Sequence, residues 1–275
     1  MDAVSCFLWV AVPVAALAYA AVCDVRSREV PDVCWAVVCI AGSSVYSVCS
    51  CDGWEMAVPY LMGSALLTAC MLSEHLTGPW ALAAFASSAV LMAVPYLTGR
   101  SGYEGVAVPV MFSVHYLLYR TGLLRGGADA KCLMSIAIAF PVQPSAGCIP
   151  LIWSQASVFP GVSIQVLAIA LAMTLPSGLM MIMGNLVRGY RGPGMWQTRR
   201  MTLESARDAF VWPVDCSGKR AVVLYDKKRA LDEAESSGVG AIRVTPMIPF
   251  ILPLAVAFAM VAVLGDPLQA LASRC

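Results

Sequence analysis

The feature that most restricts the fold of this chain is a series of apolar runs, each long enough to cross a lipid bilayer as a helix. A transmembrane helix needs roughly 17–25 residues. Eight stretches of about this length follow one another, at about 3–23, 32–50, 56–74, 79–98, 104–123, 131–149, 162–187 and 246–265. Only 13% of the 275 residues are charged, about half the share found in soluble domains. The sequence therefore predicts an all-α polytopic membrane bundle of about eight transmembrane helices.

One of these runs carries prolines. Pro141, Pro144 and Pro150 fall in or beside the 131–149 run, and proline removes a backbone donor and interrupts a helix. We therefore expect a short or bent helix here.

The composition changes completely between residues 188 and 245. This segment holds eleven of the 18 basic residues, together with seven acidic ones. The run at 219–226 is typical of a short strand, and 227–238 of a short helix that ends at Gly238. The sequence thus predicts a transmembrane bundle over 1–187, a small cytosolic α+β insert over 188–245, and a final transmembrane helix with the C-terminus over 246–275. Because acidic residues interleave with the basic ones, nucleic acid is not an expected partner, whereas membrane lipids are.

The distribution of basic residues predicts the orientation of the chain, because short cytosolic loops carry an excess of Lys and Arg. Arg26 and Arg28 follow the first run, and Arg120, Arg125 and Lys131 flank the connection between the fifth and sixth. An N-terminus outside the cell places these loops and the insert inside. We therefore expect a multi-pass protein of the cytoplasmic membrane, with Asp24 and Asp129 both on its cytosolic face.

These two aspartates are the candidate catalytic residues. Asp24 ends the first apolar run, and Asp129 begins the sixth. Ionisable groups at such positions are expensive and often functional. A helix C-terminus disfavours a negative charge, which favours the protonated form of Asp24, whereas a helix N-terminus favours the carboxylate of Asp129. Two carboxyls with such different environments suit acid–base hydrolysis, with Asp129 as the base and Asp24 as the acid.

Small residues precede Asp129. Gly126, Gly127 and Ala128 allow a substrate strand to approach the backbone closely, and a flexible loop before a helix is the other reading of the same residues. The acidic residues Glu29 and Asp32 are candidates to attract a basic substrate segment.

Other chemistries have weaker support. The 11 cysteines form no C-x-x-C pair, the two histidines have no zinc-protease spacing, and neither a G-x-S-x-G nor a Walker A motif occurs. We expect no metal and no cofactor.

The stretches "DVRSREVPD" at 24–32, "GGADAK" at 126–131 and "VTPMIPFILP" at 244–253 resemble the archaeal prepilin and preflagellin (archaellin) peptidases. These belong to the type IV prepilin peptidase family of GxGD-type aspartyl membrane proteases. The resemblance implies that Asp24 and Asp129 are the catalytic aspartates, and that Gly126 and Gly127 begin the glycine motif. It implies an endopeptidase that removes the short basic leader of a prepilin or preflagellin at the cytosolic membrane boundary.

Two departures from the family pattern stand out. Ala128 occupies the place of the second glycine, which we expect to be tolerated unless that position needs a positive φ. Four runs separate the two aspartates, so the hairpin at 56–98 is additional. The sequence leaves two alternatives open: a proton- or cation-coupled transporter that uses the two aspartates, and a non-enzymatic assembly scaffold. It does not predict the oligomeric state.

Overall fold

The structure is a computed structural model that describes residues 3–51, 53–73, 78–99, 104–124, 126–144, 151, 161–192, 194–215, 222–224 and 226–265. The chain divides into two compact units, one of residues 1–171 with 249–275 and the other of residues 172–248. The boundary falls inside helix α7, so the second half of this helix belongs to the unit that holds the predicted insert. The first unit is entirely helical in its described part.

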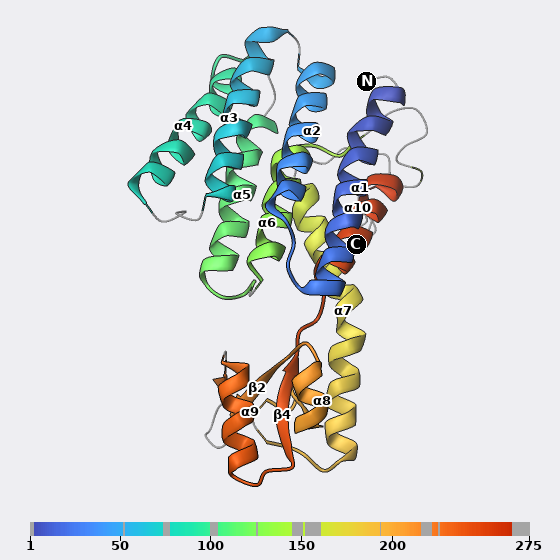
Figure 1. Cartoon of the computed structure of the whole chain (residues 1–275). Helices are drawn as coiled ribbons and strands as arrows, with labels where there is room; N and C mark the ends of the chain where they lie inside the picture. Colours follow the sequence, from blue (N-terminus) through green and yellow to red (C-terminus); the bar gives the residue numbers. More distant parts are fainter. Residues whose placement is uncertain are drawn as a thin grey trace. The chain divides into compact units, whose positions relative to one another are not determined.

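The first unit contains helices that follow the predicted apolar runs (Figure 1). They are α1 (Ala3–Ser27), α2 (Asp32–Ser50), α3 (Trp54–Leu72), α4 (Pro79–Leu97), α5 (Glu104–Arg120), α6 (Gly127–Ala139), the first part of α7 (Val162–Val187) and α10 (Ile251–Leu264). Among the described residues, five helices are long and apolar enough to cross a membrane, namely α1, α2, α3, α4 and α7. The protein is therefore a membrane protein with a helical bundle.

Helix α6 differs from the prediction and lies at the centre of the bundle. The run at 131–149 predicted a helix over those residues, but α6 begins at Gly127 and ends at Ala139, just before Pro141. It packs against α2, α3, α5 and α10, and its residues from Cys132 to Ala139 are all buried. A helix of 13 residues is too short to cross a bilayer alone.

Side chains of other helices bind the carbonyl groups at the end of α6. The last carbonyls of a helix lack partners within it. The Trp9 indole N–H donates to the Ala139 carbonyl at 3.0 Å, and the Tyr60 hydroxyl donates to the Ile138 carbonyl at 2.7 Å. These bonds fix α6, the helix that carries Asp129, against α1 and α3.

The second unit contains a four-stranded antiparallel sheet of order β1-β4-β2-β3. Its elements are β1 (Arg199–Thr202), α8 (Leu203–Asp208), β2 (Val211–Asp215), β3 (Val222–Val223), α9 (Lys227–Ser236) and β4 (Ala241–Pro246), together with the second half of α7. A small core of Ala206, Val211, Leu231 and Val244 joins the helices to the sheet.

The predicted α+β character of the insert is present in the structure, although only part of it was located from the sequence. Helix α9 covers most of the expected 227–238 helix; Gly238 follows it with φ 71°. The strand expected over 219–226 is reduced to β3, and residues 216–221 and 225 lie outside the described part. Arg207 of α8 pairs with Glu235 of α9 at 2.7 Å, so basic and acidic residues of this unit neutralise each other in part.

Candidate functional site

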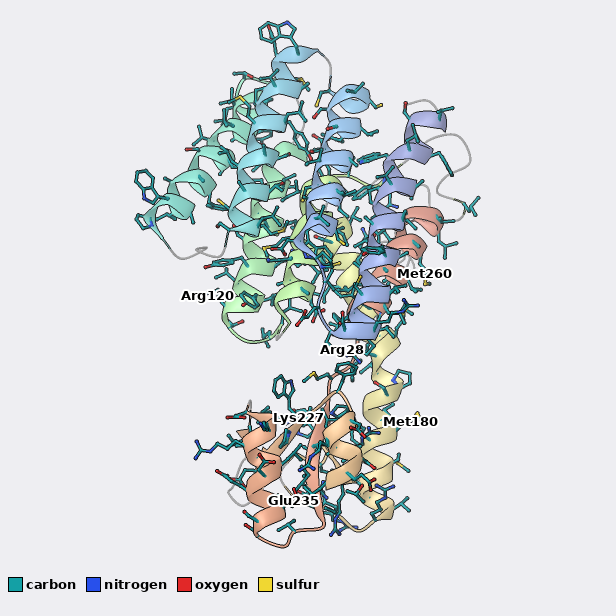
Figure 2. The ribbon with its side chains drawn as sticks, viewed as in Figure 1. Arg28, Arg120, Met180, Lys227, Glu235 and Met260 are labelled. Atoms are coloured by element: carbon teal, nitrogen blue, oxygen red, sulfur yellow. The ribbon has the colours of Figure 1, made fainter. Side chains whose placement is uncertain are left out.

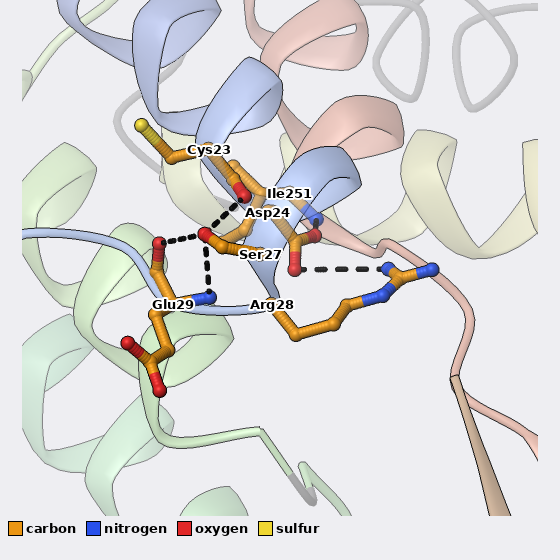
Figure 3. Close-up of polar contacts among 6 residues, drawn as sticks. All are labelled: Cys23, Asp24, Ser27, Arg28, Glu29 and Ile251. Atoms are coloured by element: carbon orange, nitrogen blue, oxygen red, sulfur yellow. Dashed lines mark hydrogen bonds and ion pairs between the residues drawn. The ribbon is translucent and has the colours of Figure 1, made fainter. Parts of the chain in front are cut away.

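Asp24 lies in the last turn of α1, which continues to Ser27 and so runs beyond the predicted end at residue 23. Its carboxylate accepts a hydrogen bond from the backbone N–H of Ile251 at 3.3 Å (Figure 3). Ile251 is the first residue of α10, and a helix N-terminus favours a nearby negative charge. The α10 N-terminus therefore offsets the unfavourable position of Asp24 at the end of α1.

Arg28 supplies a second partner for Asp24. Its guanidinium lies 3.8 Å from the other carboxylate oxygen, and both side chains are largely buried (Figure 3). Arg28 has φ 61°, a left-handed conformation that is unfavourable for a residue with a side chain. The Ser27 hydroxyl donates to the Cys23 carbonyl at 3.0 Å and accepts from the Glu29 N–H at 3.4 Å. The helix end is thus held in the turn that carries Arg28.

Asp129 is the third residue of α6, and its carboxyl lies against the backbone of Gly126. A Cβ placed on Gly126 would clash with a carboxyl oxygen of Asp129 and would lie 2.7 Å from its Cγ. A side chain at position 126 therefore fits only if the Asp129 carboxyl moves. At Gly127 the nearest atom to such a Cβ is the Tyr119 hydroxyl oxygen at 3.8 Å, so this position is open and exposed.

Ala128 lies in the first turn of α6 with helical backbone, and it packs against the core of the bundle. Arg28 is the residue other than glycine that has a positive φ in the described part of the chain. The alanine in place of the family's glycine therefore needs no unusual conformation. This agrees with the expectation that the change is tolerated.

The end of α1, which carries Asp24, and the start of α6, which carries Asp129, lie at the same end of the first unit (Figure 1). Burial, together with a smaller effect of the negative charge of Asp24, raises the pKa of Asp129 from 3.8 to about 7. The two groups therefore lie close enough to interact electrostatically. Burial opposes the expectation that Asp129 is the ionised member of the pair, and the helix N-terminus that favours its charge does not cancel this effect.

The other candidate acidic residues have different surroundings. Asp32 pairs with Lys131 at 2.7 Å, which joins the start of α2 to the first turns of α6. This pair, rather than attraction of a substrate, is what the structure shows for Asp32. Glu29 is exposed, and Arg125 lies outside the described residues.

An apolar groove begins beside the site. It has a volume of about 570 Å³ and runs between α1 and α10, from Val25 and Arg26 along a row of small and branched side chains. Ala18 and Ala21 line it on α1, and Ala255 and Ala259 on α10.

Sequence reasoning missed Arg28 and Ile251 as partners of Asp24. The spacing of four residues between Asp24 and Arg28 is a signal that points to an ion pair on a helix. No pattern in the sequence indicates the contact between Ile251 and Asp24, since the two residues are 227 positions apart.

Comparison of the chain with models of protein families and with curated proteins finds no match in either set.

Proposed function

We propose that this protein is a membrane-embedded aspartyl endopeptidase of the type IV prepilin peptidase kind. It removes a short basic leader from a prepilin or preflagellin precursor at the cytosolic boundary of the cytoplasmic membrane. The observation that carries this proposal is that burial and the negative charge of Asp24 raise the pKa of Asp129 to about 7, so the two carboxyls interact although they belong to different helices. Aspartic proteases use two neighbouring carboxyl groups, of which one holds a proton and the other is ionised.

The contacts of the two aspartates suggest their roles. Arg28 and the Ile251 amide offset part of the cost that burial places on a charged Asp24, so we assign Asp24 as the base that takes a proton from water. The resulting hydroxide attacks the peptide carbonyl carbon, while protonated Asp129 gives its proton to the carbonyl oxygen. Asp24 then passes its proton to the leaving nitrogen as the C–N bond breaks, and Asp129 recovers a proton from the diol.

The surroundings of the pair suit a precursor with a polar and an apolar part. Gly127 is exposed at the start of α6, so an extended leader can approach the backbone beside Asp129. The groove between α1 and α10 is apolar and reaches Val25 and Arg26, which follow Asp24 in α1. We propose that it receives the apolar helix of the precursor, with small residues that permit close helix approach.

The proposal is tested with the purified chain and a precursor that has a basic leader followed by an apolar helix. We expect cleavage by the wild type and none by Asp24→Asn or Asp129→Asn, with Asp208→Asn as the matched control because Asp208 is exposed in the second unit. Intact precursor after incubation with the folded wild type contradicts the proposal. So does cleavage by either variant of the pair at the wild-type rate.

The pKa of about 7 at Asp129 also favours a second candidate, a proton-coupled transporter, because such a group exchanges protons at neutral pH. Proton flux into vesicles that contain the purified chain distinguishes the two. A flux that Asp129→Asn abolishes, without any peptide cleavage by the wild type, favours transport.

A further inference from the structure

Helices α4 and α5 touch at one end and separate toward the other (Figure 1). Near the start of α5, a Cβ placed on Gly105 would lie 2.7 Å from the Met92 carbonyl oxygen, so the two backbones are in close contact there. Further along, the rings of Phe85 and Phe112 lie 6.2 Å apart between their centroids. The space between the helices thus widens from backbone contact to the width of two aromatic side chains.

Beyond this ring pair the helices enclose a cavity of about 500 Å³. Leu82 and Phe85 of α4, Phe112 and Leu117 of α5, and Cys70 of α3 form much of its wall. The walls are mainly apolar, and the helices around it are those of a membrane bundle, so an aliphatic chain suits the interior of the cavity.

Arg120 also lines this cavity, and it is the last residue of α5 (Figure 2). It is exposed, and it is the charged residue among the described ones that line the cavity. A guanidinium binds phosphate oxygens through paired N–H donors. Basic side chains beside pockets between membrane helices are suited to anionic lipid headgroups.

We propose that this cavity binds one anionic phospholipid, with its phosphate on Arg120 and an acyl chain between α4 and α5. A free phosphate ion would meet Arg120 but leave the apolar walls without a partner, whereas a phospholipid matches both parts. The bound lipid fills the space between the separated ends of α4 and α5, and holds α4 on the bundle. This proposal does not depend on the protease activity.

The test measures lipid bound to the purified full chain by native mass spectrometry. Phosphatidylglycerol and phosphatidylcholine with the same acyl chains are compared, with inorganic phosphate as a competitor. We expect the wild type to prefer phosphatidylglycerol by about fivefold, and inorganic phosphate to leave the complex intact. Arg120→Gln removes the preference, and Arg120→Lys retains it. Ala81→Phe, which fills the cavity, lowers the binding of both lipids.

Matched controls are Arg200→Gln, an exposed arginine of β1, and Ala83→Phe, on the exposed face of α4. Both retain wild-type lipid binding if the proposal is correct. Three outcomes overturn it: an unchanged preference in Arg120→Gln, equal lipid loss in Ala83→Phe and Ala81→Phe, or displacement of the lipid by inorganic phosphate. Arg120 is exposed, so Arg120→Gln tests the proposal even if Ala81→Phe fails to fold.

Discussion

At the scale of single residues, the raised pKa of Asp129 has a consequence for stability. Because the folded state raises this pKa from 3.8 to about 7, it favours the protonated carboxyl. The contribution of protonated Asp129 to the free energy of unfolding is complete below the pKa that this carboxyl has in the unfolded chain. It is lost as the pH rises through about 7. We therefore expect the Tm of the wild type to fall more steeply than that of Asp129→Asn between about pH 5 and about pH 8.

The measurement is thermal unfolding of both proteins in the same detergent over this pH range. Parallel pH dependence of the two Tm values would show that Asp129 does not titrate with a raised pKa.

Gly126 and Gly127 are predicted to respond differently to the same substitution. Gly126→Ala places a methyl group against the Asp129 carboxyl, at a cost of about 1–3 kcal/mol in stability. Displacement of that carboxyl lowers cleavage by about 100-fold. Gly127→Ala meets no atom closer than 3.8 Å, and alanine is the better helix former by about 1 kcal/mol. Cleavage rates and Tm values of the two variants check this, and equal effects of both would contradict it.

The sequence identified both aspartates as a candidate pair, because apolar runs and basic residues predicted that they share one face. It did not predict the proton affinity of Asp129. That property depends on burial and on the negative charge of Asp24, which follow from the tertiary packing of the bundle and not from residues near Asp129 in the chain.

At the scale of the elements, the position of α6 depends on its contact with α2. A Cβ on Gly42 would clash with the Ala139 side chain and would lie 2.8 Å from the Ala139 Cα. We expect Gly42→Ala to cost about 1–3 kcal/mol and to lower cleavage by moving α6. Gly178→Ala in α7 is the control, since nothing lies within 4 Å of its Cβ. Thermal unfolding in detergent measures both, and a Gly42→Ala variant as stable as Gly178→Ala would be inconsistent with this packing.

The groove between α1 and α10 gives a prediction that separates recognition from chemistry. Ala255→Leu narrows the groove and is expected to slow cleavage of a membrane-anchored precursor by about tenfold, equivalent to about 1.4 kcal/mol. Cleavage of a short leader peptide without the apolar helix stays unchanged. Ala86→Leu, on the exposed face of α4, is the control. Equal slowing of both substrates would place the defect at the aspartates and not in the groove.

The boundaries of the helices and strands show which elements could be predicted from the sequence alone. The charge pattern at 227–238 was enough to predict α9, because a short amphipathic helix is a local property. The 131–149 run misplaced α6, because α6 begins at Gly127, before the apolar run, and ends at Ala139, before Pro141. The strands β1, β2 and β4 were not predicted, since each is short and completes its pairing with residues distant in the sequence.

At the scale of the whole molecule, the described chain consists of a helical membrane bundle and a small α+β unit of mixed charge. Positive charge near the ends of apolar runs predicts that the aspartate pair faces the cytosol. The central claim is that Asp24 and Asp129, which belong to helices separated by α2–α5 in the sequence, act on the substrate as one unit.

The most direct test is precursor cleavage by the wild type, Asp24→Asn, Asp129→Asn and the double variant, with folding checked by thermal unfolding. Residues that act as one catalytic unit give non-additive losses. We predict that each single variant is as inactive as the double variant. A double variant whose loss equals the product of two partial losses, or a single variant with the wild-type rate, would contradict the claim.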